Sequence, residues 1–329
     1  MLIDTKGISI MKGNPVVRMI VKEERLKIGI IIGIIALAII FVFIILNFSK
    51  DKKSEPSYNM LSAGAAHTTV LHIDGTVSVI GDSGFPQIET ETWKDILAVS
   101  TGSAHTVGLT KVGTVVATGD NLYGQIEVKS WEGITAVSAG AYHTVGLKED
   151  GTVVAAGDNY YKQLEVDSWN NIIYVAAGAI NTIGVREDGT VVAAGDNSRG
   201  QINVDDWTDI VSVSSGSNHT IGLKSDGTVI AVGDNSHGQL DVEEWKDIIF
   251  VSAGVGISIG LKDDGTVIAA GDNYAGQINL LKWDKIVAVS AGCGYTVGIK
   301  SDGTAVEAGN HEDLEKDIPY VRDVGYPIN

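Results

Sequence analysis

The feature that most constrains this chain is a repeat of 38 residues, which runs without insertion through most of its length. One copy runs from Trp131 to Ser168 and contains the run VSAGAYHTVGLKEDGTVVAAGDN. Two glycines and one tryptophan return at this step. They are Gly64, Gly102, Gly140, Gly178, Gly216, Gly254 and Gly292; Gly75, Gly113, Gly151, Gly189, Gly227, Gly265 and Gly303; and Trp93, Trp131, Trp169, Trp207, Trp245 and Trp283. A period of this length predicts stacked units that bury one another.

Each copy predicts three short strands. In the copy quoted above they cover residues 134–139, 143–148 and 152–156. Asp150-Gly151 separates the last two, and an Asp-Gly pair between apolar runs is a strong hairpin signal because glycine supplies the positive φ. The second copy has Lys111-Val112-Gly113 there and keeps the glycine. We also expect a fourth short strand over 163–166, before the next tryptophan, and no helix in the repeats.

Both faces of these strands are apolar or small, so each sheet needs cover on two sides. Val145 and Leu147 point one way, and Thr144 and Gly146 point the other. We expect the small faces to receive Val and Leu of the next sheet, and the tryptophans to pack between sheets rather than stack on a ligand. Seven copies favour an all-β, seven-bladed β-propeller of 38-residue repeats over an open solenoid.

The first and last copies depart from the pattern. Val70 stands where the other copies have a glycine in the middle strand, and Glu55 stands in the tryptophan place. In the last copy Val321 takes the tryptophan place. We therefore predict that residues 318–328 lie beside the first blade and close the ring.

The N-terminal part of the chain differs from the repeats. Residues 28–48 carry no charge over 21 positions, and such a helix would be about 31 Å long, enough to cross a bilayer. A buried soluble helix would need a polar stripe, and a cleaved signal peptide would need a small-x-small site that LNFSKDKK lacks. We predict one N-terminal transmembrane helix that precedes the propeller.

The expected organisation follows from this span. Residues 1–27 form a cytoplasmic segment, 28–48 a transmembrane signal-anchor helix, 49–57 a polar tether, and 58–329 the propeller. Six basic residues precede the span and three follow it, so the positive-inside rule keeps the N-terminus in the cytoplasm and places the propeller outside a bacterial cell.

Charge and cysteine content exclude several classes of protein. The chain has 24 Lys and Arg against 41 Asp and Glu, a net charge of −17, and residues 1–57 hold nine of the basic and five of the acidic residues. An acidic body repels phosphate backbones, so we expect no nucleic-acid partner. The single Cys293 excludes an internal disulfide framework and a zinc site made of cysteines.

The run SAGxxHTxxLxxDGTVxxxGDNxxGQ resembles the repeat of the regulator of chromosome condensation family, whose members are seven-bladed propellers. The short repeat is similar to that of bacterial members, which include a propeller-type β-lactamase inhibitor protein. The resemblance implies two alternative functions, inhibition of a secreted enzyme such as a β-lactamase and guanine nucleotide exchange on a GTPase. The exchange factor acts through insertions and a basic tail that this sequence does not have.

Two sets of polar residues recur in the repeats and consist of residue types that bind metal ions. His67, His105, His143 and His219 share one place in the repeat, and an Asp follows the glycine that ends the third strand in six copies, from Asp82 to Asp272. We interpret the histidines as hydrogen-bonding groups that bridge loops and the aspartates as caps of Asx-type turns, because neither set offers several ligands in one copy. We expect no metal, no cofactor and an unpaired thiol at Cys293.

No phosphate loop, metalloprotease helix or nucleophile elbow occurs, so we expect a binding protein rather than an enzyme. The alternative is a catalytic pocket assembled from several blades, which a sequence of near-identical repeats would conceal.

Strand parity indicates where a partner would bind. The loops after the first and third strands of each copy should open at one end of the propeller, and they are the variable ones. Aromatic and charged residues gather there, as in a recognition surface, with neutral drift of exposed positions as the alternative. The candidate binding residues are Phe85, Tyr123, Tyr142, Tyr160, Tyr161, Arg199, His237 and Tyr274. The predicted function is a membrane-anchored extracytoplasmic propeller that binds a protein or an envelope polymer through this face.

Overall fold

A computed structural model of the chain describes residues 58–72, 74–81 and 88–309. The chain divides into two compact units, Met1–Glu55 and Pro56–Asn329, and the described residues belong to the second. The predicted transmembrane helix at 28–48, the tether at 49–57, the closing segment at 318–328 and Phe85 lie outside the described residues and remain predictions. Among the residues described, no helix is long and apolar enough to span a bilayer.

The described residues of the second unit form seven antiparallel sheets, each made of three strands that are consecutive in the chain. We call these sheets blades 1 to 7. Their strands are β1 (Tyr58–Ala63), β2 (His67–His72) and β3 (Val77–Gly81); β4 (Ile96–Thr101), β5 (His105–Thr110) and β6 (Val115–Gly119); β7 (Ile134–Ala139), β8 (His143–Lys148) and β9 (Val153–Gly157); β10 (Ile172–Ala177), β11 (Asn181–Arg186) and β12 (Val191–Gly195); β13 (Ile210–Ser215), β14 (His219–Lys224) and β15 (Val229–Gly233); β16 (Ile248–Ala253), β17 (Ile257–Lys262) and β18 (Val267–Gly271); β19 (Ile286–Ala291), β20 (Tyr295–Lys300) and β21 (Ala305–Gly309).

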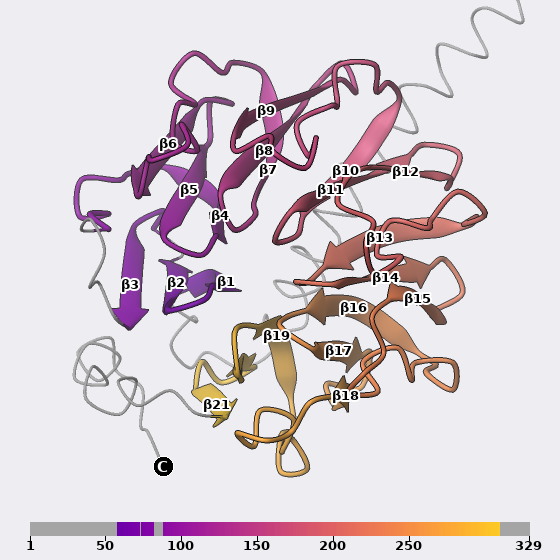
Figure 1. Ribbon diagram of the computed structural model, residues 1–329. Coiled ribbons are helices and arrows are strands. Elements are labelled where there is room, and N and C mark those ends of the chain that lie inside the picture. Colours follow the sequence, from indigo (N-terminus) through magenta and orange to yellow (C-terminus); the bar gives the residue numbers. More distant parts are fainter. Residues whose placement is uncertain (1–57, 73, 82–87, 310–329) are drawn as a thin grey trace, which may run out of the picture. The chain divides into compact units, whose positions relative to one another are not determined.

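The blades stand around a common axis, with the first strand of each blade innermost (Figure 1). The same hydrogen bond links neighbouring inner strands at six of the seven interfaces, as when the N–H of Ala139 donates to the hydroxyl of Ser100. The bond recurs between the last blade and the first, where the N–H of Ala63 donates to Ser290 at 2.9 Å. The unit is therefore a closed seven-bladed β-propeller and not an open solenoid.

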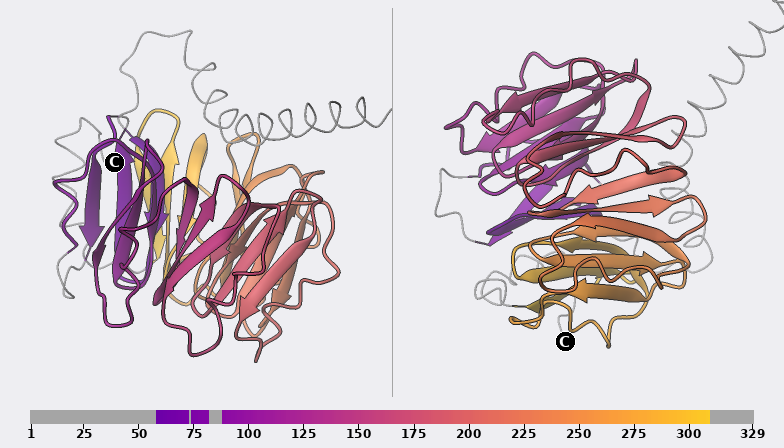
Figure 2. Two further views of the ribbon diagram at one scale, coloured as in Figure 1. Left: turned by 90° about the horizontal axis from the view of Figure 1, so that it is seen from above. Right: turned by 45° about the vertical axis from the view of Figure 1, so that its right-hand side comes forward.

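A closed ring of three-stranded blades has two unlike ends. The turns between second and third strands form the hairpin end, where Gly151 adopts a φ of +78° and the Asp150 carboxylate accepts the N–H and hydroxyl of Thr152. Gly113 has the same φ without the aspartate, as expected. The loops after first and third strands form the opposite end, which we call the loop end; Figure 2 shows the strands running between the two.

The core lies between blades. Val145 and Leu147 face the following blade, where they pack with Trp169 and Ile172. The small face of each blade receives Val and Leu of a neighbouring blade as expected, since Val107 and Leu109 of blade 2 share a cluster with Ala156 of blade 3. The same face also receives a tryptophan. A β-carbon on Gly146 would lie 2.8 Å from the ring of Trp131, so the glycine makes room for the indole that precedes each blade. The tryptophans are buried between blades, as predicted.

The expected fourth strand at 163–166 does not form. The segment makes consecutive turns, in which Glu165 donates its N–H to Lys162 and Val166 donates to Leu164. The segment has to cross from the loop end back to the hairpin end to start the next blade. Its two buried residues lie in different places: Gln163 is hydrogen-bonded within the loop, and Val166 packs in the core between blades. Residues on one face of a strand are separated by two positions, whereas Gln163 and Val166 are separated by three, as in successive turns.

Candidate functional site

The two kinds of variable loop meet at the loop end. We call the loops after first strands inner loops and the segments 120–127, 158–165, 196–203, 234–241 and 272–279 outer loops. In blade 3 the N–H of Asp158, which opens the outer loop, donates to the carbonyl of Tyr142 in the inner loop at 2.9 Å. The same bond joins the two loops in blades 2, 4, 5 and 6. The loops therefore gather at one end, as strand parity predicts.

A buried glutamine shapes each outer loop. The amide nitrogen of Gln163 donates to the Asp158 carboxylate at 2.9 Å, and its amide oxygen accepts the N–H of Tyr161 at 2.9 Å. Asp158 also accepts the N–H of Tyr160 at 3.1 Å, which is the predicted Asx-type turn. Both oxygens of the Asp158 carboxylate thus accept hydrogen bonds from groups of its own loop, and Asp158 supports the loop tip. Equivalent glutamines occur in the other outer loops, namely Gln125, Gln201, Gln239 and Gln277.

With its backbone held in this way, the tip of each outer loop carries two adjacent side chains at the surface. The first is strongly exposed: Leu122 by 76%, Tyr160 by 82% and Tyr274 by 98%. The second, whose N–H is held by the glutamine, is less exposed, with Tyr123 at 48% and Tyr161 at 42%. The sequence reasoning overlooked Leu122 as a site residue. Its alignment with Tyr160 and Tyr274 at the repeat step was the signal that could have found it.

Four of the predicted tyrosines come together on blades 2 and 3. The rings of Tyr123 and Tyr142, from neighbouring blades, have centroids 5.4 Å apart and are tilted by 56°. The rings of Tyr160 and Tyr161 meet edge to face with centroids 5.0 Å apart. Since the Tyr142 carbonyl binds Asp158, two residues before Tyr160, the pairs are neighbours. We call Tyr123, Tyr142, Tyr160 and Tyr161 the tyrosine patch.

The remaining predicted residues are not part of this patch. Arg199 on blade 4 lies 3.9 Å from the Asp234 carboxylate of blade 5. His237 accepts or donates a hydrogen bond with Ser236 at 3.0 Å. Tyr274 stands on blade 6. The loop end is therefore asymmetric, with aromatic residues concentrated on two blades.

The repeated histidines are structural. His143 Nε2 lies 3.0 Å from the hydroxyl of Thr182 in the next blade, and that hydroxyl donates to the Gln163 carbonyl at 2.7 Å. The Thr182 proton is thus committed, so His143 donates through Nε2. The predicted bridging hydrogen bond is confirmed, although it joins blades rather than loops. Burial lowers the pKa of His143 to about 4, and those of His67, His105 and His219 likewise.

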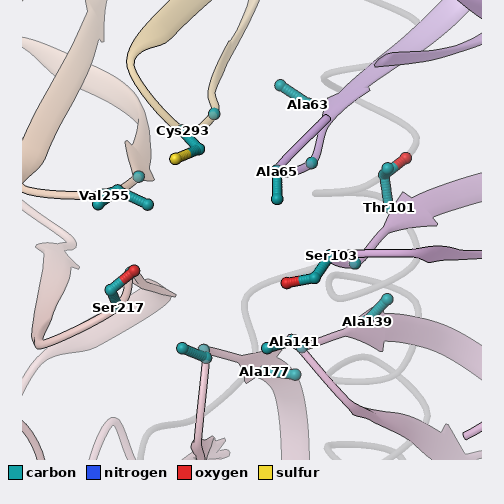
Figure 3. Close-up of a pocket in the computed structure, with 18 of the residues that line it drawn as sticks. Ala63, Ala65, Thr101, Ser103, Ala139, Ala141, Ala177, Ser217, Val255 and Cys293 are labelled. Atoms are coloured by element: carbon teal, nitrogen blue, oxygen red, sulfur yellow. The ribbon is translucent and has the colours of Figure 1, made fainter. Parts of the chain in front are cut away.

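The axis of the ring ends at the loop end in a small cavity of about 110 Å³. Figure 3 shows the side chains that surround it, which are small and include Ser217, Val255 and the free Cys293. The glycines that follow the inner strands pack closely around the axis, because a β-carbon on Gly140 would collide with the carbonyl oxygen of Gly178 in the next blade. In the described ranges, no group of three His, Cys, Asp or Glu side chains is placed to hold a metal ion. Cys293 is a potential nucleophile in this lining, but no His, Asp, Glu, Lys or Arg lies among the lining residues to activate it.

The opposite end has four exposed apolar side chains, on blades 2, 4, 5 and 6, that no prediction from the sequence named. The second residue of each inner strand sits at a bulge in the pairing of that strand. Leu97, Ile173, Val211 and Ile249 occupy this place and are each nearly half exposed. The bulge turns these side chains outward.

The fold and the loop end together define a class, the β-propellers that present variable loops on a rigid ring. The family model of the regulator of chromosome condensation (RCC1) repeat matches residues 96–125, 134–163, 172–201, 210–239 and 248–277. The chain belongs to this repeat family. No curated protein sequence matches it significantly.

Solved structures with the same fold come from different settings. The CRINKLY WD40 ectodomain of the Arabidopsis thaliana receptor kinase ACR4 is 20% identical with a TM-score of 0.64, over 79% of this chain and 97% of that one. Prp20p of Saccharomyces cerevisiae, described with its binding to Gsp1p and histones, is 16% identical with a TM-score of 0.59, over 80% and 85%. Human WBSCR16 is 17% identical with a TM-score of 0.60, over 73% and 85%. At these identities the likeness concerns the fold.

Proposed function

We propose that this protein is an anchored extracytoplasmic propeller that binds a macromolecular partner, a protein or an envelope polymer, through its loop end. The tyrosine patch carries this proposal. Buried glutamines hold the backbone N–H groups of Tyr123 and Tyr161. Asp158 accepts the N–H of Tyr160 and donates its own N–H to the Tyr142 carbonyl. The four exposed rings therefore stand on fixed backbone, so little conformational entropy is lost when a partner binds. Tyrosine is among the residues that dominate binding energy at protein interfaces.

Chain connectivity supports the orientation. Tyr58 pairs with His72 beside the first hairpin turn, so the chain enters the propeller at the hairpin end. The predicted tether would therefore join the propeller at the end opposite to the loop end. The ACR4 ectodomain is an instance of this fold carried by a receptor kinase, and Prp20p is an instance that binds proteins.

Capture of a partner tests the binding role. The full-length chain, with Tyr123, Tyr142, Tyr160 and Tyr161 replaced by Ala, should lose at least about 90% of the partner that wild type captures by cross-linking in intact cells. The matched control replaces Leu97, Ile173, Val211 and Ile249 by Ala, which removes four similarly exposed side chains at the hairpin end. Equal melting temperatures establish that both variants fold. Capture that survives the tyrosine replacements contradicts the proposal.

Topology has its own test. An external protease added to intact cells should digest the propeller, while a cytoplasmic marker protein stays intact. Protection of the propeller in intact cells, with digestion after lysis, would place it inside and reject the extracytoplasmic assignment.

A further inference from the structure

We infer that the tyrosine patch recognises a basic segment of a partner protein, with Arg or Lys side chains seated on the tyrosine rings. The inference rests on the proposed function and specifies the chemistry of the partner. It distinguishes a cationic peptide from an anionic envelope polymer and from a neutral glycan, which the loop end could otherwise be thought to bind.

The first observation is the charge around the patch. The five outer loops of blades 2 to 6 contain eight acidic residues, Asp120, Glu127, Asp158, Glu165, Asp196, Asp234, Asp241 and Asp272, and two basic ones, Lys162 and Arg199. Both basic groups face a carboxylate, because Lys162 lies 3.7 Å from Glu165 and Arg199 lies 3.9 Å from Asp234. The loop end therefore attracts cations and repels polymers that carry phosphate or carboxylate groups.

The second observation is the arrangement of the rings. Aromatic faces carry partial negative charge and bind guanidinium and ammonium groups within about 6 Å of the ring centroid. The pairs Tyr123–Tyr142 and Tyr160–Tyr161 meet at tilted or edge-to-face angles. In such a pair the edge of one ring covers one face of the other, so each ring keeps at least one face that its partner ring does not cover. Within the described residues no basic side chain of the protein forms a salt bridge or hydrogen bond with any of these four tyrosines. The rings are thus available to a cation from outside.

The third observation separates the carboxylates that support the loops from those that face solvent. Asp120 and Asp158 are bound by the glutamine amide and by backbone N–H groups. Glu127 and Glu165, at the end of the same loops, are exposed. The only hydrogen bond that Glu127 makes in the described part is from the Asn121 amide at 2.8 Å. Glu127 can pair with a partner's basic group through its other carboxylate oxygen, and Glu165 can do so by exchanging its exposed ion pair with Lys162.

Lys162 is the one unfavourable group in this arrangement. It adopts a φ of +68°, where the other described outer loops have glycine, and its side chain is 73% exposed. Its positive charge lies next to Tyr161, so it should weaken the binding of a basic peptide. Replacing it with glycine, the residue that fits this backbone conformation, removes the charge without loss of loop geometry.

The test measures peptide binding to the full-length chain in a neutral detergent. The probes are synthetic peptides of one length that differ only in carrying Arg, Lys, Gln or Glu at the same positions, together with a neutral chitin oligosaccharide. We expect the Arg peptide to bind best, and its Kd to rise about tenfold between about 50 and about 300 mM sodium chloride. The Gln and Glu peptides and the oligosaccharide should bind at least about tenfold more weakly.

Variants locate the binding. Tyr123→Ala with Tyr142→Ala should weaken the Arg peptide about tenfold or more, while the matching Phe replacements stay within about twofold because the ring faces remain. Glu127→Gln with Glu165→Gln should weaken it several-fold, whereas Asp241→Asn, the same charge change at the same loop position in blade 5, should have no effect. Lys162→Gly should tighten binding about twofold to fivefold.

Three results would overturn the inference. These are equal binding of the Gln or Glu peptide, tyrosine-dependent binding of the oligosaccharide without dependence on salt, and an Arg peptide whose affinity is the same for wild type and for the Tyr→Ala variant. If the Arg peptide does not bind while capture of the cellular partner still requires the tyrosines, the basic partner is rejected and the loop-end function stands. Capture that does not need the tyrosines rejects the loop-end function itself.

Discussion

At the scale of single residues, the blades are held together by buried polar groups in a repeated position. Blade 4 shows an alternative to histidine at this place. Asn181 exchanges hydrogen bonds with Ser215 of blade 5 at 2.9 and 3.1 Å, and Ser215 stands where other blades have an alanine such as Ala177. The interface of blade 4 is thus built without the imidazole group, which can be protonated in mild acid when the chain unfolds.

The histidine solution makes stability dependent on pH. Unfolded histidine binds a proton near pH 6.5, whereas burial lowers the pKa of His143 in the folded protein to about 4. Between these values the unfolded state binds more protons, so the free energy of unfolding falls as the pH decreases from 6.5 to 4. Each buried histidine contributes a loss of up to about 3 kcal/mol at the acid end of this window.

The double variant His143→Asn with Ala177→Ser transfers the blade 4 solution to the neighbouring interface. It should match wild type in denaturant unfolding at pH 7 and lose less stability between pH 6.5 and pH 4, with a difference of up to about 3 kcal/mol. Carboxylates that titrate in the same range are common to both proteins and cancel in the comparison. Parallel stability curves for the two proteins would show that His143 does not cause the pH dependence.

At the scale of elements, the local pattern of apolar residues and turn signals predicted the three strands of a blade well. The first two strands of blade 3 were predicted with the bounds that β7 and β8 have, and the third is shifted by one residue. The segment 163–166 was predicted wrongly because a run of four residues with alternating polarity is compatible with a strand and with successive turns. Its glutamine is buried to hold the loop tip, and a pattern of apolar residues does not reveal such a role.

The tryptophan–glycine contact is the element-scale feature that is easiest to test. Gly146→Ala places a methyl group 2.8 Å from the Trp131 ring and should lower the free energy of unfolding by about 1–3 kcal/mol. Trp131→Ala should cost about 3–5 kcal/mol. In the Trp131→Ala background, Gly146→Ala should cost much less, because the ring that it strikes is gone. Additive losses in chemical denaturation would show that the two residues do not share one site.

At the scale of the whole molecule, the ring is closed by the same contacts that join its other blades, with one addition. Tyr295, in the place of the histidines, reaches from blade 7 to blade 1 and donates its hydroxyl to the carbonyl oxygens of Gly64 and His67, 3.2 and 3.1 Å away. Burial raises the pKa of this tyrosine to about 12, so it stays protonated and able to donate.

Loss of this hydroxyl should weaken the closure. Tyr295→Phe is expected to lower the free energy of unfolding by about 1–3 kcal/mol, because the buried carbonyl of His67 and the part-buried carbonyl of Gly64 lose a donor. Tyr274→Phe, which removes a hydroxyl from a side chain that is 98% exposed, is the matched control and should change nothing measurable. Thermal unfolding of the full-length chain compares the two, and equal melting temperatures would remove Tyr295 from the closure.

The sequence alone determined the number of blades, the place of most strands and the end at which variable loops gather. This was possible because a strict 38-residue step repeats one local pattern seven times, and strand parity then leaves a single arrangement of the loops. Only the tertiary structure decided that Trp131 rests on Gly146, that Gln163 supports a loop tip, and that Tyr123 meets Tyr142 across two blades. The packing of the blades brings Trp131 onto Gly146 and Tyr123 onto Tyr142, and the role of Gln163 depends on side-chain hydrogen bonds within its loop. A local pattern of apolar residues reveals neither kind of contact, because it records polarity along the chain and not which side chains meet.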